Sequence, residues 1–219
     1  MAATLFPCGP AGSVNIGSAA VPTWTATANP ATGAAGSTVT FTSVALGATD
    51  PSRATVVMVH TEATIATGCS VGGVAMTKAI EEASAISSLQ IWVAVTSGLG
   101  TTANIVLTAG GSMTAPMIMV GRFTGITSFS TATNAVNTAG ADPATITAIV
   151  PTGGFGIAGI TGNPTNTGTW SNATLDFRTN TGTGLTTSMS HTSTAGSQTP
   201  TYTGLAGGVS HMVMACFGP

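Results

Sequence analysis

The most informative property of this 219-residue chain is its lack of charge. Lysine and arginine together number four and aspartate and glutamate six, so 5% of the residues are charged, where about 25% is usual in a soluble domain. Four scattered basic residues cannot neutralise a run of phosphates, which argues against nucleic acid as a partner. A disordered chain would combine low hydrophobicity with high net charge, but here 43% of the residues are hydrophobic and the net charge is −2.

Signals for export and membrane insertion are also missing. No lysine or arginine precedes Arg53, and the first residues contain no apolar core of the kind found in signal peptides, so we expect no export signal. The longest apolar runs, such as 54–59 and 115–120, have the length of a strand and are too short for a membrane-spanning helix. We therefore expect no membrane partner.

Cysteine is scarce, and its spacing predicts no cross-linked framework. Cys8, Cys69 and Cys216 are odd in number and far apart, without a CxxC pair, so they indicate neither a disulfide scaffold nor a zinc site. Buried free thiols are the simplest interpretation. A bridge between Cys8 and Cys216 stays open, because the sequence cannot establish the geometry that a disulfide needs.

Recognisable catalytic motifs are absent as well. The chain contains no GxSxG, no P-loop and no HExxH. His60 and Glu62 would lie on one face of a strand and could share a metal, although a solvated or hydrogen-bonded pair is the simpler interpretation. Asp176 and Arg178 would also share a strand face as a surface ion pair. We expect no enzyme activity, no metal and no cofactor.

Threonine, glycine, asparagine and short β-branched runs dominate what remains. Threonine and valine favour strands, while glycine and asparagine favour turns, so the pattern predicts an all-β, antiparallel two-sheet β-sandwich with a jelly-roll-like form. Both faces of 208–217 are mostly apolar, which predicts a central strand covered on both sides. In 154–161, alternating glycines predict close approach of another segment. Strands are expected at 38–46, 54–62, 68–71, 74–80, 88–96, 103–108, 116–124, 144–150, 154–161, 173–178, 185–190 and 208–217.

The chain shows no sharp domain boundary. Residues 1–37, rich in alanine, glycine and proline, predict an extended N-terminal arm, followed by a single β-sandwich domain over 38–219. Two long polar connections are expected at 126–143 and 162–172. In the second of them Trp170, with Asn166 and Asn172, is the candidate contact for a ligand or partner.

The only lysine lies in an unusually charged stretch. Lys78, Glu81 and Glu82 fall within five positions and at first suggest an acid–base site. Gly72-Gly73 favours a type I′ hairpin turn between two short strands, so these charges would lie at the far end of the second strand and in the following loop. There they would keep a sheet edge soluble, with an inter-subunit salt bridge as the alternative.

Four segments follow one another in a recognisable order: TVTFTSVALGATDPSRATVVMVH, CSVGGVAMTKA, LQIWVAV and ANIVLTAGGSMTAPMIMVGRFTGI. Over residues 38–162 the chain resembles β-sandwich virion proteins of tailed bacteriophages, although Ser52 stands before Arg53 where those proteins have a direct Asp-Arg pair. The resemblance implies a structural protein of the virion, assembled in the host cytoplasm, and transfers no catalytic residue.

Low surface charge is itself suited to assembly, because it limits repulsion among neighbouring copies. Low charge thus favours a homo-oligomer, and the resemblance implies a head decoration (cement) protein that binds the major capsid protein or other virion proteins. The alternative is a tail-associated adhesin whose loops contact host-surface glycans. A glycan hydrolase is a distant third: six acidic residues could include the paired carboxylates of such enzymes, but these enzymes usually line the sugar cleft with tryptophan and tyrosine, of which this chain has three and one.

Overall fold

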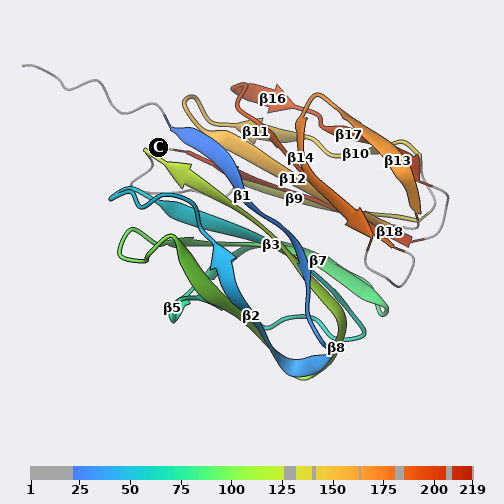
Figure 1. Cartoon of the computed structure of the whole chain (residues 1–219). Coiled ribbons are helices and arrows are strands. Elements are labelled where there is room, and N and C mark those ends of the chain that lie inside the picture. The colour runs from blue at the N-terminus through green and yellow to red at the C-terminus, as the bar shows by residue number, and fades with distance from the viewer. Residues whose placement is uncertain are drawn as a thin grey trace, which may run out of the picture.

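The computed structural model describes residues 22–125, 132–139, 142–162, 164–180, 185–205 and 209–218. All regular secondary structure in these ranges is β-strand, and every strand pair is antiparallel (Figure 1). The predicted all-β, antiparallel class is thereby confirmed. In the same ranges no helix has the length and hydropathy needed to cross a membrane.

The N-terminal half contains two connected sheets. Inner sheet 1 has the order β1-β8-β3-β7-β6, and outer sheet 1 is formed by β2, β4 and β5 with the first part of β8. Strand β8 therefore passes from one sheet into the other. The bounds are β1 Thr23–Thr32, β2 Gly36–Ala45, β3 Ala54–Glu62, β4 Gly68–Val71, β5 Val74–Ala75, β6 Thr77–Ala83, β7 Ser87–Val95 and β8 Thr102–Thr124.

The C-terminal half repeats this arrangement. Inner sheet 2 has the order β14-β15-β12-β18-β9, and outer sheet 2 consists of β10-β17-β13 together with the β11-β16 pair. The bounds are β9 Ala132–Ala139, β10 Ala144–Thr145, β11 Ala148–Val150, β12 Phe155–Gly162, β13 Pro164–Ser171, β14 Thr174–Asn180, β15 Thr186–Thr192, β16 Gly196–Gln198, β17 Thr201–Leu205 and β18 Val209–Phe217.

Both halves connect equivalent strands in the same chain order. Inner sheet 1, read β1-β8-β3-β7-β6, corresponds strand by strand to β9-β18-β12-β15-β14 in inner sheet 2. In the outer sheets, β2 and β4 flank the first part of β8 as β10 and β13 flank β17. The two halves therefore repeat one strand order, which the sequence pattern did not predict.

The four sheets stack in layers around three apolar cores (Figure 1). Val57 and Val59 of β3 face outer sheet 1, whereas Val56 and Met58 face inner sheet 2. On the far side of inner sheet 2, Ile160 packs toward outer sheet 2. The central strands of the two inner sheets are therefore buried on both faces, as the apolar faces of 208–217 predicted for β18.

Close packing of the two inner sheets depends on a glycine. A Cβ atom placed on Gly159 of β12 would lie 2.2 Å from the Sδ atom of Met58 in the opposite sheet. Because Gly159 has no side chain, the Met58 side chain fills the space above it. The prediction that the glycines of this strand admit a large neighbouring group is confirmed.

Two expected loops contain strands, and two expected strands are one. Most of the expected loop 162–172 is strand β13, and the expected loop 126–143 contains β9. The strands expected at 103–108 and 116–124 are one strand, β8. Strands β9 and β13 were missed because ATNAVNTA and PTNTGTWS lack the apolar alternation that marks a half-buried strand.

The predicted arm 1–37 also needs correction where the structure describes it. Residues 23–32 form β1, which pairs with β8 of the same chain, and β2 begins at Gly36. Residues 1–21 of the expected arm lie outside the described residues. The division into an arm and one domain, and the jelly-roll-like two-sheet sandwich, are not established by this strand order and stay predictions.

Candidate functional site: a polar pocket beside the seam of the inner sheets

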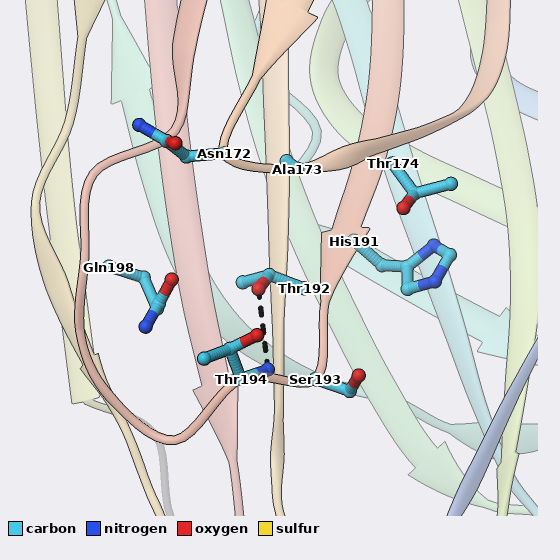
Figure 2. A pocket seen from close by; sticks show the side chains of 8 residues that line it. All are labelled: Asn172, Ala173, Thr174, His191, Thr192, Ser193, Thr194 and Gln198. Carbon is cyan, nitrogen blue, oxygen red and sulfur yellow. Dashed lines mark hydrogen bonds between the residues drawn. The ribbon is translucent and has the colours of Figure 1, made fainter.

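A polar pocket of about 370 Å³ opens at one end of inner sheet 2. Its lining comes from the β13–β14 turn and the start of β14 (172–174), the end of β15 and the segment after it (191–194), and Gln198 of β16. In Figure 2, Asn172 and Gln198 lie on one side of this lining, while Thr174 and His191 lie on the other. Hydroxyl, amide and imidazole groups from three segments thus line the pocket.

The local sequence accounts for the shape of the pocket rim. Asn172 has a φ of 59°, in the left-handed region that asparagine tolerates better than most residues. It therefore allows the tight turn between β13 and β14, and its side-chain amide donates to the carbonyl of Thr199 at 3.1 Å. This bond ties the turn to the neighbouring outer sheet.

A β-bulge directs a carboxylate toward the pocket histidine. In the pairing of β14 with β15 the register shifts between Leu175 and Phe177, so Asp176 is the extra residue. Bulges commonly re-aim a side chain in this way. The Oδ1 atom of Asp176 lies 2.8 Å from Nδ1 of His191 and accepts a 3.2 Å bond from the indole N–H of Trp24.

Protons can be placed on this cluster from the hydrogen-bonding roles. An ionised carboxylate only accepts, so Nδ1 of His191 must donate to Asp176, which leaves Nε2 as the acceptor of a neutral imidazole. The Asp176 side chain is 6% exposed and that of His191 23%. Oδ2 of Asp176 is buried without a hydrogen-bond partner among the described residues.

Trp24, which belongs to inner sheet 1, also contacts this site. It belongs to β1 and lies directly over Gly121 of β8, where an added Cβ would be 2.1 Å from the indole ring. Its ring centroid is 4.9 Å from that of Phe123 and 6.1 Å from that of His191. Trp24 also lines a second pocket, of about 450 Å³, which shares Ser193 with the first.

The site combines an Asp–His pair with hydroxyl and amide groups. An Asp–His pair could act as a general base, but no hydrogen bond joins His191 to Ser193 or to another hydroxyl among the described residues. The same residues contain no group of three potential metal ligands. What the site offers is a set of fixed donors and acceptors.

The residues predicted to contact a ligand do not all line the pocket. Asn172 lines the pocket. Trp170 lies in strand β13, its indole N–H donates to Ser188 Oγ at 2.9 Å, and its ring packs edge-on to Tyr202 at 5.3 Å. Trp170 is therefore partly buried and already hydrogen-bonded. The side chain of Asn166 lies outside the described residues.

For the other polar residues and the cysteines, the structure agrees with the sequence predictions in part. Asp176 pairs with His191 and not with Arg178, whose guanidinium donates to the carbonyl of Gly168. His60 and Glu62 do lie together, with Nε2 and Oε1 3.6 Å apart. Of the three cysteines, Cys69 and Cys216 are buried free thiols, and Cys8 lies outside the described residues.

The charged stretch around Lys78 forms a sheet edge. Gly72 and Gly73 both have positive φ, as a type I′ turn requires, and β6 is the last strand of its sheet. Lys78, Glu81 and Glu82 all lie within β6, so placing the two glutamates in a loop was wrong. The Lys78 ammonium contacts Glu81 Oε2 at 2.5 Å and lies 5.3 Å from the Trp92 ring centroid.

These contacts account for the titration of the two glutamates. Partial burial opposes ionisation of Glu81, but hydrogen bonds from Lys78 and Gln90 outweigh it and lower the pKa of that carboxyl. Partial burial and the neighbouring charge of Glu81 raise the pKa of Glu82. Lys78 is paired within its own chain.

We predict that Lys78→Ala costs about 1 kcal/mol or less of unfolding free energy, because a partly exposed ion pair is weak. Thermal unfolding measures this cost, and analytical ultracentrifugation should show an unchanged association state. Loss of an oligomer in the variant would instead show that Lys78 bridges subunits.

The sequence alone could not have identified this pocket. Asn172, His191 and Gln198 lie within 27 consecutive residues but belong to no motif, and the bulge that turns Asp176 toward His191 leaves no signature in LDFR. Of the pocket residues, the sequence pointed only to Asn172, as a possible ligand contact. No protein-family model, curated protein or solved structure matches the chain.

Proposed function

We propose that this chain is a structural protein of a bacteriophage particle that decorates and stabilises the exterior of the capsid. Three properties support the proposal: the resemblance of residues 38–162 to virion proteins, the scarcity of charge, and the layered all-β structure. In this proposal each inner sheet and its outer sheet form one jelly-roll-like β-sandwich, and the protein acts as a homo-oligomer.

The observation that carries the proposal is the uncharged outward face of outer sheet 2. Strands β10, β11, β13, β16 and β17 contain no charged residue. Ile149 of β11 is 67% exposed. Exposed hydroxyls of these strands and their connections form pairs, with the Thr147 and Thr199 Oγ1 atoms 3.0 Å apart and those of Thr169 and Thr203 2.9 Å apart. Because the centres of protein interfaces are depleted in charged residues, such a face suits docking to a capsid.

The buried inner layers support a stabilising role. Apolar cores cover the central strands of both inner sheets on their two faces. A protein docked on the capsid through one outer sheet would therefore add a closely packed layer that resists deformation. A low net charge of −2 also allows many copies to lie close together on one particle.

We predict that the protein binds purified heads that lack it and raises their melting temperature, and that Ile149→Asp weakens this binding at least tenfold. A buried, unpaired carboxylate at the interface would have to be desolvated. Ile86→Asp is the matched control, because Ile86 is 61% exposed in the β6–β7 turn, away from outer sheet 2.

Co-sedimentation with heads and calorimetry of the complex make both measurements. If the unmodified protein neither binds heads nor raises their melting temperature, the decoration role is wrong. If Ile149→Asp and Ile86→Asp bind equally well, the docking face has been misassigned.

A second candidate, a tail-associated adhesin that contacts host-surface glycans, is favoured by one observation. The pocket beside Trp24 and His191 presents polar groups and an aromatic ring, a combination that suits a sugar. The location of the protein on the particle separates the two candidates.

A further inference from the structure

We propose that the pocket of Figure 2, together with the adjoining pocket at Trp24, binds a neutral saccharide of one or two sugar units. The two pockets share Ser193 and have volumes of about 370 and 450 Å³, within the range of small-molecule sites. The inference does not depend on whether the protein sits on the head or the tail, so its failure would leave the decoration proposal standing.

The chemistry of the lining selects the ligand class. Its side chains are mainly hydroxyls and amides, and no lysine, arginine, aspartate or glutamate lines either pocket. An anionic or cationic ligand would therefore lose its hydration without a compensating charge. An apolar ligand would leave the polar groups of Asn172, Thr174 and Gln198 without partners. A neutral polyhydroxylated ligand can satisfy these donors and acceptors and bring its own.

The Asp176–His191 pair supplies an oriented acceptor to this site. Asp176 accepts the Nδ1 proton of His191, so the imidazole is held in one orientation with Nε2 able to accept from a sugar hydroxyl. Asp176 is itself held by the Trp24 indole N–H. The buried carboxylate, with an Oδ2 atom that has no partner among the described residues, is thus a positioning residue that acts through His191.

Trp24 supplies an aromatic wall for the second sugar unit. The ring rests on Gly121 and packs against Phe123, which fixes its position, and it lines the pocket next to Ser193. Sugar rings present C–H groups that pack on aromatic faces, and the indole combines a large apolar surface with low conformational entropy. A disaccharide spanning Ser193 would contact both the polar pocket and this ring.

The experiment uses the full chain and a panel of neutral saccharides: glucose, galactose, mannose and N-acetylglucosamine, each also as its β-linked disaccharide. Saturation-transfer NMR detects binding, and isothermal titration calorimetry gives the dissociation constant. We expect at least one disaccharide to bind, and Asn172→Gly/Gln198→Ala to weaken it at least tenfold. Glycine keeps the positive φ at residue 172, so this variant should fold normally.

Two further variants make the test specific. Asp176→Asn should weaken binding of the same sugar severalfold, because the amide can no longer fix the His191 proton at Nδ1. Asn104→Ala removes an exposed amide from β8 in outer sheet 1 and should leave the affinity unchanged. The proposal is overturned if no panel member binds the folded protein, or if the pocket variants and Asn104→Ala bind with equal affinity.

Discussion

Gly159→Val should destabilise the protein by about 2–3 kcal/mol, which is typical of forcing extra methyl groups into a packed core. The added Cβ would lie 2.2 Å from Met58 Sδ and 3.4 Å from Leu89, and all these groups are buried between the inner sheets. The added methyl groups must displace the packed Met58 side chain, so the loss should appear in chemical denaturation as a lower midpoint.

A second variant and a control sharpen this test. Met58→Ala should partly rescue Gly159→Val, because it removes the side chain that occupies the space, and the double-mutant cycle should give a favourable coupling energy. Gly110→Val is the matched control, since Gly110 is an exposed strand glycine with no atom within 4 Å of an added Cβ. Equal destabilisation by both valines would contradict face-to-face packing of the inner sheets.

Acidification from pH 6.5 to about 4 should also destabilise the fold, by about 3 kcal/mol from His211 alone. Burial, assisted by the nearby charge of His60, lowers the pKa of His211 to about 4. Burial also lowers the pKa of His60, against the opposing charge of Glu62. The two histidines belong to β3 and β18, in opposite inner sheets.

Stability falls on acidification because the pKa of His211 is lower in the folded protein than in the unfolded chain. The stabilisation is fully present above the unfolded pKa of His211, near 6.5, because the neutral form is favoured in both states there. It is lost as the pH falls toward the folded value near 4. Near pH 4 the His211 imidazole of the unfolded chain is protonated. Protonation is less favourable in the folded chain, where His211 is hydrogen-bonded to Ser87 Oγ at 2.9 Å.

His211→Gln tests the assignment, since the glutamine amide can replace the bond to Ser87 and does not titrate. Denaturation at a series of pH values should show a steep loss of stability in the unmodified protein and a shallower one in this variant. An identical pH profile would mean that other groups govern the acid response.

The strands that could be predicted are those buried on at least one face. β3 and β4 were expected with the bounds that the structure has, because their apolar residues recur between clear turn signals. β1 and β13 were missed since TWTATANPAT and PTNTGTWS contain no valine, isoleucine or leucine. Such strands form because neighbouring strands, β8 and β17, offer unpaired backbone groups.

The candidate site was harder to foresee because it depends on irregular backbone. Asp176 and Arg178 share a face of a regular strand, but the bulge in β14 turns Asp176 to His191. The partners of a bulged residue are decided by tertiary packing, here by Trp24 arriving from the other inner sheet. Trp170 was singled out for its polar neighbours in sequence, whereas in space it packs against Tyr202.

The most direct test of the central proposal is a high-resolution cryo-electron microscopy reconstruction of the purified phage particle whose genome encodes this chain. The account predicts density for the four-layer body on the outer surface of the capsid, in a copy number set by the capsid lattice, with outer sheet 2 facing the shell. Density confined to the tail, or a purified particle without the protein, would contradict it.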